Sequence, residues 1–436
     1  MSLGSRNKKI VFSPIRGATE TGGLSGHHEM FTMGRMFMME RGRGKRLSIC
    51  VSVQKILFEY GVWGKNMEVQ HTIPVSAGSR RYSIEISRLE RLGEMVSSLG
   101  LNDRILIITD ENVDHLYGER AAESLAGMQD EIAILTVVPG EPAKSLLTAE
   151  KLWERLAEMR VDRRSTIVAL GGGVVGDLAG FIAATWMRGI PFVQVPTTLL
   201  AQVDSSVGGK VGINLHTGKN LVGAFWQPHA VLIDPTTLET LPEREYLSGL
   251  GEVVKYGMIM DAALLERLEA EVDRILARDS VVLGELIARC CRLKADVVEQ
   301  DEFERLGVRE ILNYGHTFGH ALESITHYRR YLHGEAVAIG MDFAARLAAR
   351  LGMLDPVVVQ RQRRLIEQLG LPVTYASPSP GDATISDAWC DELLRLMQCD
   401  KKNESGGTIF VLPQHPGRVE RVRVEQDLIL ETLRDE

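Results

Sequence analysis

Short apolar runs that alternate with helical segments are the feature that most constrains how this chain can fold. Residues 104–109, 132–137 and 165–170 are nearly continuous apolar runs of strand length, whereas residues 88–99 and 147–159 have the apolar spacing of helices. Continuous apolar runs are typical of strands that are buried on both faces of a sheet. Strands and helices in this rhythm predict a parallel, doubly wound α/β sheet.

More strands are expected on either side of this central pattern. Residues 68–77 and 81–86 predict a hairpin that turns at Gly78-Ser79. Residues 192–195 and 231–233 add two short apolar runs, each followed closely by a proline. We therefore predict that the first half of the chain is an α/β domain with a Rossmann-like parallel sheet.

The character of the chain changes after Leu241-Pro242. Strand signals become few, and helical spacing predicts helices at residues 247–260, 262–277, 281–299, 308–326, 334–351 and 357–369. We therefore predict an α/β domain over residues 67–242 and a mainly α-helical domain over residues 243–436. Because candidate functional residues fall on both sides of this boundary, we expect the active site in the cleft between the two domains.

Composition excludes several classes of protein. Hydrophobic residues make up 44% of the chain and charged residues 25%, which is ordinary for a soluble globular enzyme. No window approaches the roughly 18 apolar residues that a membrane span needs, and no secretory signal is recognisable. The five cysteines are not spaced as metal ligands, so we interpret them as reduced thiols of a cytoplasmic protein.

Residues 1–66 differ in charge from the rest of the chain. They carry 11 Lys and Arg against 4 Asp and Glu, whereas the remainder carries 39 against 54. The acidic remainder argues against nucleic acid as the main partner, although the basic segment could be an arm for nucleic acid or a membrane surface. Because clear periodicity begins only after Met67, we interpret residues 1–66 as a poorly ordered extension or as a segment ahead of the true start.

A glycine turn follows the predicted strand at residues 165–170. Gly171, Gly173 and Gly176 satisfy the pattern G-x-G-x-x-G between that strand and a predicted helix. Such a turn lets backbone amides approach a pyrophosphate at a helix N-terminus. The usual acidic residue about 20 positions further on is absent, and Asp110 at the end of another predicted strand could supply its contact instead. The turn therefore predicts a nucleotide site unlike that of an ordinary Rossmann dehydrogenase.

A polar cluster lies further along the same half of the chain. Residues 196–210 and 218–220 combine hydroxyl groups, glycines and two lysines, Lys210 and Lys219, on backbone that we expect to be irregular. These donors suit a bound phosphate or polyol. Because the flanking residues are apolar, we interpret the cluster as part of a binding site and not as a solvated loop.

The helical half contains three potential metal ligands, Glu252, His316 and His333. Two imidazoles and one carboxylate are the ligand set of an open catalytic zinc site. His316 and His320 are four residues apart, so a helix would place both on one face. Spacing alone therefore predicts that His316 and His320 form a metal pair, which Glu252 or His333 would complete.

Several longer motifs occur in a fixed order along the chain, at residues 171–177, 203–210, 251–257, 309–320, 332–335 and 400–403. Together they resemble the 3-dehydroquinate synthase family of the shikimate pathway. The resemblance covers essentially Met67 to the C-terminus and leaves residues 1–66 unmatched. It implies an NAD-binding α/β domain followed by a helical metal-binding domain, in agreement with the boundary predicted above.

The resemblance also implies which residues bind the metal. In members of the family, the residues that match Glu252, His316 and His333 hold the ion. The residue that matches His320 faces the substrate, which differs from the pairing that spacing alone predicts. Zinc and cobalt suit the same ligands, so the resemblance implies either ion.

The resemblance further implies sets of cofactor and substrate contacts. The expected NAD contacts are Asp110, Asn112, Glu141, Lys144, Gly173, Val174, Val175, Gly176, Asp177, Thr197, Thr198, Lys210, Lys219, Thr237, Leu238, Glu239 and Thr240. The expected substrate contacts are Asp204, Lys210, Asn220, Lys255, Lys294, Arg309, Asn313, His320 and one of Lys401 or Lys402. Arg188 matches an arginine that reaches the substrate phosphate of the neighbouring subunit, so a homodimer is expected.

The implied reaction converts 3-deoxy-D-arabino-heptulosonate 7-phosphate to 3-dehydroquinate and phosphate. It proceeds by transient NAD-dependent oxidation, phosphate elimination, re-reduction and intramolecular aldol closure. The nearest alternative is another sugar phosphate cyclase, such as 2-deoxy-scyllo-inosose synthase, whose substrate lacks the carboxylate that Arg309 and Asn313 would handle. A metal-dependent alcohol or glycerol dehydrogenase is more remote, because it leaves the phosphate-type lysines Lys210 and Lys401 or Lys402 unexplained.

Overall fold

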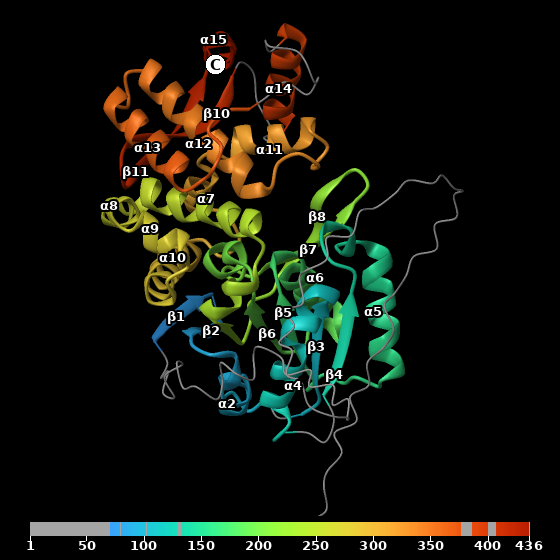
Figure 1. Cartoon of the computed structure of the whole chain (residues 1–436). Coiled ribbons are helices and arrows are strands. Elements are labelled where there is room, and N and C mark those ends of the chain that lie inside the picture. Colours follow the sequence, from blue (N-terminus) through green and yellow to red (C-terminus); the bar gives the residue numbers. More distant parts are fainter. Residues whose placement is uncertain are drawn as a thin grey trace, which may run out of the picture. The chain divides into compact units, whose positions relative to one another are not determined.

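The computed structural model describes residues 70–78, 80–101, 103–128, 132–375, 386–399 and 407–435 (Figure 1). All of these residues belong to one compact unit. Two of the predictions fall outside them. These are the interpretation of residues 1–66 and the choice between Lys401 and Lys402 as a substrate contact.

A seven-stranded sheet organises the first half of the described chain. In spatial order its strands are β1 (His71–Ala77), β2 (Arg80–Ile86), β9 (Ala230–Ile233), β6 (Phe192–Pro196), β5 (Thr166–Gly171), β3 (Ile105–Asp110) and β4 (Ala133–Val137). The pair β1 and β2 is antiparallel, and the other neighbouring strands are parallel. The predicted hairpin and the predicted parallel strands are therefore confirmed, in a sheet that is mixed but mostly parallel.

Alternate side chains of strand β3, which lies between β5 and β4, pack into two different hydrophobic layers. Leu106 and Ile108 share a layer with residues of α5 and α6, whereas Ile105 and Ile107 share a layer with residues of α2 and α4. All four side chains are fully buried, which explains why the strand shows no apolar alternation in the sequence. The four helices are α2 (Leu92–Ser98), α4 (Glu119–Leu125), α5 (Leu146–Glu158) and α6 (Gly173–Thr185).

Short turns at the carboxyl ends of the strands carry many of the predicted cofactor contacts. Pro196 and Gly171 end neighbouring strands, so the segments that follow them begin side by side. These short elements are α3 (Glu111–Val113), η2 (Asp114–Gly118), η3 (Glu141–Ala143), η5 (Ala201–Ser205) and η6 (Pro235–Thr240). Another short element, η4 (Trp186–Arg188), connects α6 to the start of β6.

The polar cluster after β6 is more regular than predicted. Lys210 and Lys219 lie in an antiparallel hairpin of β7 (Lys210–Leu215) and β8 (Gly218–Phe225). The prediction of irregular backbone is therefore wrong for this part of the cluster. Most side chains of β8 are partly or fully exposed, so the strand lacks the apolar alternation that marks packing on a core.

Helices dominate the second half of the described chain, where α11 to α15 are coloured orange to red in Figure 1. Each main helix predicted from spacing has a counterpart, although two of the predicted helices are interrupted. The helices are α7 (Glu243–Met260), α8 (Ala262–Ala270), α9 (Val272–Leu276), α10 (Ser280–Gln300), α11 (His316–Ile325), α12 (His333–Arg350), α13 (Pro356–Gln368), α14 (Asp387–Cys399) and α15 (Gln426–Arg434).

The two interruptions are corrections to the predicted helices. The helix predicted at residues 262–277 is divided at Glu271 into α8 and α9. The helix predicted at residues 308–326 is a 3₁₀ turn, η7 (Val308–Asn313), followed by α11. Gly315 separates them because its φ of 77° lies in the left-handed region, which does not continue a right-handed helix.

A C-terminal hairpin and two helices were not predicted. Strands β10 (Thr408–His415) and β11 (Arg418–Val424) pair antiparallel, and α14 and α15 lie on either side of them in sequence. Phe410 and Leu412 of β10 belong to the hydrophobic core of the helical half. The hairpin therefore extends a core to which the helices and residues of β1, β2 and β9 also contribute.

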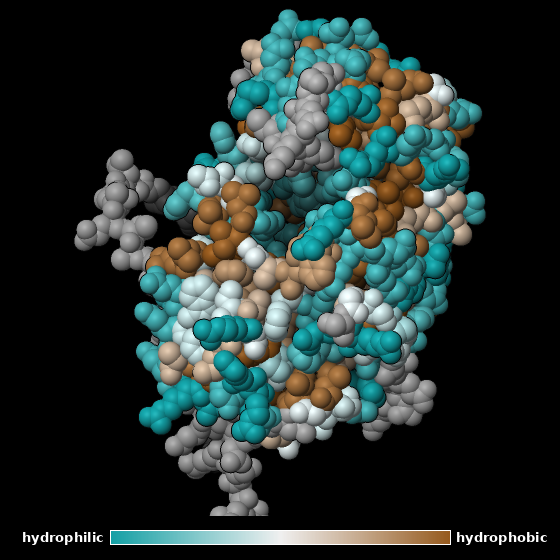
Figure 2. All heavy atoms as spheres, turned by 180° about the vertical axis from the view of Figure 1, so that it is seen from behind, coloured by the Kyte–Doolittle hydropathy of each residue, from teal (hydrophilic) through white to brown (hydrophobic). Residues whose placement is uncertain are grey.

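No helix in the described segments is long and apolar enough to cross a membrane. On the face drawn in Figure 2, hydrophilic residues in teal separate the hydrophobic areas in brown from one another.

Candidate active site

Three helices each supply one side chain to a cluster of potential metal ligands. Glu252 lies within α7, His316 begins α11 and His333 begins α12. Glu252 Oε1 is 3.5 Å from His316 Nε2 and 3.7 Å from His333 Nε2. One ligand atom from each residue lies within 4.8 Å of the others, so the structure brings together the three residues that the resemblance implies.

Close backbone contact between α7 and α12 brings two of these ligands together. A Cβ atom at Gly251, just before Glu252, would lie 2.6 Å from the carbonyl oxygen of Gly334. A Cβ atom at Gly334, just after His333, would overlap the carbonyl oxygen of Ser248. The two helices can approach this closely only because glycines occupy the crossing point.

The crossing of α11 and α12 follows the same principle. A Cβ atom at Gly340 would overlap the carbonyl oxygen of Gly315, the residue before His316. A Cβ atom at Gly319 would lie 3.1 Å from the carbonyl oxygen of Ala336. Glycines therefore place α12 against both helices that carry the other ligands.

Each imidazole of the cluster turns Nδ1 toward an oxygen atom and Nε2 toward Glu252. His316 Nδ1 is 3.0 Å from the carbonyl oxygen of Tyr314, and His333 Nδ1 is 3.3 Å from Glu323 Oε2. An Nδ1–H that donates to such an acceptor leaves the lone pair of Nε2 free to bind a metal ion. The orientation of both rings therefore fits metal binding at one point beside Glu252.

The carboxylate of Glu252 also fits a metal ion. Both of its oxygens are buried, and Oε1 has no hydrogen-bond partner among the described residues. Lys255 forms an ion pair with Oε2 and is itself buried. Buried polar atoms normally have a hydrogen-bond partner or a bound ion, and a divalent cation at Glu252 Oε1 would supply the missing partner. Two imidazoles and one carboxylate are also the donor set of an open zinc site.

The protonation of the two imidazoles reflects their surroundings. Burial and the nearby Lys255 ammonium lower the pKa of His316 to about 3, which keeps its imidazole neutral. Burial opposes protonation of His333 as well, but the carboxylates of Glu252 and Glu323 raise its pKa to about 10. The cluster therefore favours a positive charge beside Glu252, and a metal ion would supply that charge in place of a proton.

A cavity of about 540 Å³ lies next to this cluster. Residues from both halves of the chain line it. It adjoins the metal ligands through Asp204, which lines the cavity and lies 4.0 Å from Lys255 Nζ. The predicted contacts among its lining residues are Asp177, Asp204, Lys210, Asn220, Lys294 and Arg309.

Two residues at this cavity were not predicted. The Tyr256 hydroxyl donates a 2.6 Å hydrogen bond to Asp204 Oδ1. Glu304 forms an ion pair with Lys210 and lies 3.4 Å from Arg309 Nε, so it places an anion among the cations of the cavity. The only sequence signals for them are their positions, next to Lys255 and five residues before Arg309.

On the sheet side, Lys144 joins two of the predicted binding segments. Its Nζ lies 2.6 Å from Asp177 Oδ2 and 2.6 Å from Asn220 Oδ1, and its side chain is buried. Burial raises the pKa of Asp177, and the Lys144 ammonium opposes that shift. Asp177 lies in the first turns of α6, which begins directly after β5. The unpaired N–H groups at the start of α6 therefore face the carboxyl ends of the strands, where a phosphate can bind.

Other predicted cofactor contacts surround this helix start. The Thr197 N–H donates to the carbonyl oxygen of Gly171 at 3.0 Å, and a Cβ atom at Gly172 would lie 2.9 Å from Thr198. Asp110 ends β3, and its Oδ1 accepts the N–H of Asn112 at 2.9 Å. Burial raises the pKa of Asp110 despite this bond.

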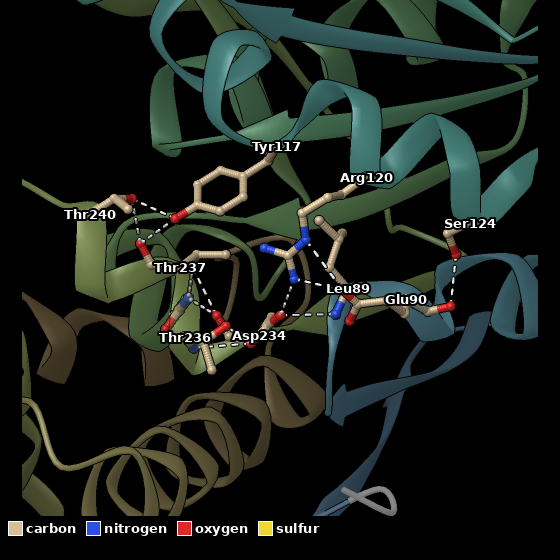
Figure 3. A network of polar contacts seen from close by, with 10 residues as sticks. Leu89, Glu90, Tyr117, Arg120, Ser124, Asp234, Thr236, Thr237 and Thr240 are labelled. Atoms are coloured by element: carbon tan, nitrogen blue, oxygen red, sulfur yellow. Dashed lines mark hydrogen bonds and ion pairs between the residues drawn. The ribbon is translucent and has the colours of Figure 1, made fainter. Parts of the chain in front are cut away.

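A polar network holds the turn that carries Thr237 and Thr240 (Figure 3). The Tyr117 hydroxyl contacts Thr240 Oγ1 and donates to the carbonyl oxygen of Thr237 at 3.2 Å. Asp234 caps η6 and accepts the N–H of Leu89 at 2.9 Å. The network therefore ties the predicted cofactor turn η6 to η2 and to the segment that follows β2.

Not all predicted contacts lie at the cavity. Among the described residues, Arg188, Asn313, Lys255 and His320 are not part of its lining. His320 groups with Glu323 and His333, each of which offers one potential ligand atom within 4.8 Å of the others. Lys219 Nζ, on β8, lies 3.9 Å from Glu141 Oε1.

Known proteins match this chain over most of its length. The family model described as 3-dehydroquinate synthase N-terminal matches residues 134–248, and the one described as 3-dehydroquinate synthase C-terminal matches residues 249–403. The 3-dehydroquinate synthase of Desulforamulus reducens is 49% identical over 351 residues, which cover 80% of this chain and 95% of that protein. This chain belongs to the 3-dehydroquinate synthases.

The activity of this 3-dehydroquinate synthase is that of a carbon–oxygen lyase of the shikimate pathway. Among solved structures, 2-deoxy-scyllo-inosose synthase in complex with carbaglucose-6-phosphate, NAD+ and Co2+ is 28% identical, with a TM-score of 0.74 over 84% of this chain and 100% of that one. The 2-epi-5-epi-valiolone synthase ValA of Streptomyces hygroscopicus, with NAD+ and Zn2+ bound, is 27% identical, with a TM-score of 0.72 over 84% of this chain and 98% of that one. The identity of 49% with a dehydroquinate synthase exceeds these values and decides against the alternative cyclases.

Proposed function

We propose that this 3-dehydroquinate synthase binds one divalent metal ion, zinc or cobalt, through Glu252, His316 and His333. The observation that carries the proposal is that both Nε2 atoms lie within 3.7 Å of one oxygen of a buried carboxylate. The solved neighbours contain Co2+ or Zn2+. Both ions accept this mixed set of nitrogen and oxygen ligands.

For the cofactor we propose NAD, bound on the sheet side at the start of α6. The neighbouring structures contain NAD+. Support comes from the free N–H groups of the helix start and from the fixed turn at Thr237 and Thr240. When bound, NAD supplies a hydride acceptor that is regenerated, and the metal supplies Lewis acidity.

The substrate that we propose is 3-deoxy-D-arabino-heptulosonate 7-phosphate, which carries a phosphate and a carboxylate. Three cationic side chains, Lys210, Lys294 and Arg309, line the cavity. Lysine suits phosphate as a point charge, and the fork of arginine suits a carboxylate. Lys210 and its neighbours also offset the charge of the phosphate that leaves when its carbon–oxygen bond breaks.

Lys255 connects substrate binding to the metal site in this proposal. It lies three residues after Glu252 on α7 and forms an ion pair with that ligand. Asp204, which lines the cavity, is 4.0 Å from its ammonium group. Lys255 would therefore orient a substrate oxygen beside the metal ligands, and His320, one helical turn from His316, would contact the substrate from the same helix.

Three further proposals concern the organisation of the enzyme. We propose that the NAD-binding domain ends at Pro242, because β9 is the last strand of the large sheet and α7 begins at Glu243. We propose a homodimer in which Arg188 reaches the active site of the neighbouring subunit, as the arginine that it matches does in members of the family. We propose a cytoplasmic location, because Cys290, Cys291 and Cys390 are free thiols.

One assay tests the proposed substrate and cofactor together. The metal-loaded protein is mixed with NAD+ and the heptulosonate phosphate, and free phosphate and NADH absorbance are followed. We expect phosphate release and a carbocyclic product with no net NADH. Stoichiometric NADH would contradict the proposal, and the absence of a reaction would direct the search to sugar phosphates that lack the carboxylate.

The ligand assignment has a separate test. Glu252→Gln and His333→Ala are expected to lose both activity and stoichiometric zinc, because each removes one of three ligands. A full equivalent of tightly bound zinc in both variants would contradict the assignment.

A further inference from the structure

Glu323 is a buried carboxylate at the edge of the proposed metal site. It lies three residues after His320 on α11 and is 6% exposed. Its Oε2 is 3.3 Å from His333 Nδ1, and its Oε1 is 4.0 Å from Lys219 Nζ. The sequence alone predicts no role for this residue, although its spacing from His316 and His320 places it on their face of the helix.

We propose that Glu323 is a positioning residue that orients His333 for metal binding. The proposal rests on the metal site proposed above. With Nδ1 held by Glu323, the other nitrogen of the ring faces Glu252, and Nε2 lies 3.7 Å from Glu252 Oε1. A carboxylate that accepts a hydrogen bond from Nδ1–H fixes the tautomer of the ring and makes Nε2 a stronger ligand.

The other imidazole has an acceptor of a different kind. His316 Nδ1 faces the carbonyl oxygen of Tyr314, which belongs to the backbone. A backbone acceptor holds the ring but adds no full negative charge. Glu323 therefore both orients the imidazole of His333 and raises the basicity of its Nε2, whereas the backbone acceptor of His316 only orients the ring.

The group of His320, Glu323 and His333 has the spacing of a second metal site, but two observations argue against it. A neutral imidazole has a single lone pair, so His333 cannot serve the first site through Nε2 and a second site through Nδ1. The Lys219 ammonium also lies on the far side of the Glu323 carboxylate, 4.0 Å away, and would repel a second cation. Its Nζ is held there over the ring of Tyr328, 4.0 Å from the ring centroid.

The test measures Co2+ binding to the full-length protein. The dissociation constant and stoichiometry are measured by equilibrium dialysis, and the environment of the ion by its visible absorption spectrum. We expect binding to be about 10-fold weaker in Glu323→Gln and up to about 100-fold weaker in Glu323→Ala, with an altered spectrum in both. The glutamine in Glu323→Gln can still accept a hydrogen bond from His333 Nδ1 but carries no negative charge. The loss of Co2+ affinity in Glu323→Gln therefore measures the effect of the charge on the basicity of His333. The further loss in Glu323→Ala measures the effect of orienting the ring.

A matched control is Glu335→Gln. Glu335 lies two residues after His333, but its carboxylate pairs with Arg244 and the N–H of Leu332. We expect this variant to bind Co2+ as the parent does. If Glu323→Ala lowers only the melting temperature and leaves the dissociation constant and spectrum unchanged, Glu323 has a merely structural role and the proposal is overturned.

Glu252→Gln separates failure of this inference from failure of the proposed metal site. Loss of tight Co2+ binding in Glu252→Gln together with parental binding in Glu323→Ala would overturn only the positioning role. Parental binding in Glu252→Gln would overturn both proposals. A parent that binds two Co2+ ions and a Glu323→Ala variant that binds one would make Glu323 a metal ligand, which also overturns the positioning role.

Discussion

Asp204 Oδ1 lies 2.9 Å from Lys294 Nζ, in an ion pair that joins η5 of the sheet half to α10 of the helical half. The same oxygen is 4.0 Å from Lys255 Nζ. Both lysines are buried. Burial raises the pKa of Asp204, but the two ammonium groups outweigh it and hold the pKa well below the ordinary range of a carboxyl group. Asp204 therefore lies beside two buried cations, of which Lys255 has a second anionic partner in Glu252.

The first prediction concerns this shared carboxylate. Asp204→Asn leaves the ammonium groups of Lys255 and Lys294 without their common counter-charge, and we expect it to destabilise the folded chain by about 3 kcal/mol. Denaturant unfolding measures the change. Asp279→Asn is the control, because Asp279 caps α10 and asparagine caps a helix about equally well. Equal stability of the two variants would contradict the prediction.

The second prediction concerns the crossing of α7 and α12. In Gly334→Ala the new methyl group would overlap the carbonyl oxygen of Ser248, and backbone cannot move aside as a side chain can. We expect a loss of stability of about 3 kcal/mol and weaker Co2+ binding, because the helices that carry Glu252 and His333 must separate.

A glycine without neighbours provides the control for that variant. No heavy atom lies within 4 Å of a Cβ atom built on Gly127. Gly127→Ala is therefore expected to leave Co2+ affinity unchanged. Parental Co2+ affinity in Gly334→Ala would show that the glycine contact does not control the distance between the ligands.

The third prediction concerns the anion inside the cavity. The carboxylate of Glu304 pairs with Lys210 and lies 3.4 Å from Arg309, so it competes with any anion that binds there. We expect Glu304→Gln to bind inorganic phosphate about threefold to fivefold more tightly. An exposed ion pair contributes up to about 1 kcal/mol, and phosphate no longer has to displace that pair in the variant. Isothermal titration of phosphate into the full-length protein measures the affinity.

The neighbouring carboxylate is a matched control for Glu304. Glu302 lies two residues earlier and accepts a 3.1 Å hydrogen bond from the side chain of Gln227 instead of pairing with Lys210. Glu302→Gln is expected to leave phosphate affinity unchanged. Weaker phosphate binding in Glu304→Gln would mean that the carboxylate orients Lys210 and does not compete with the ligand.

Strands that are buried on both faces could be predicted from the sequence, whereas exposed strands and breaks between helices could not. The strand at residues 105–110 was recognisable because both of its faces are buried, so that its apolar run is continuous. The hairpin of β7 and β8 was not, because every residue of β8 is partly or fully exposed and its sequence shows no alternation of apolar and polar residues. The break before α11 depends on the left-handed conformation of Gly315, which a glycine permits but does not require.

The same limit applies to the site. Glu252, His316 and His333 could be named from the sequence because their motifs resemble those of a family. Tyr256, Glu304 and Glu323 could not, because nothing in their local sequence specifies the partner that each meets across the fold. Those partners are Asp204, Lys210 and His333. Such pairs are set by packing between elements, which periodicity does not encode.

The last prediction concerns the stability of the chain in acid. His229 lies beside β6 with Arg80 Nη1 2.7 Å from its Nε2, so burial and then the guanidinium lower its pKa to about 4. An unfolded histidine has a pKa of about 6.5, so this neutral ring contributes stability above that pH and loses it as the pH falls toward 4. We expect the parent to lose on the order of 1–2 kcal/mol more than His229→Gln between pH 7.5 and 4.5, because the glutamine cannot be protonated. Denaturant unfolding at both pH values measures the difference, with His216→Gln as the control that removes an exposed histidine. Parallel loss of stability in the parent and His229→Gln would show that this ring becomes protonated without cost to the fold.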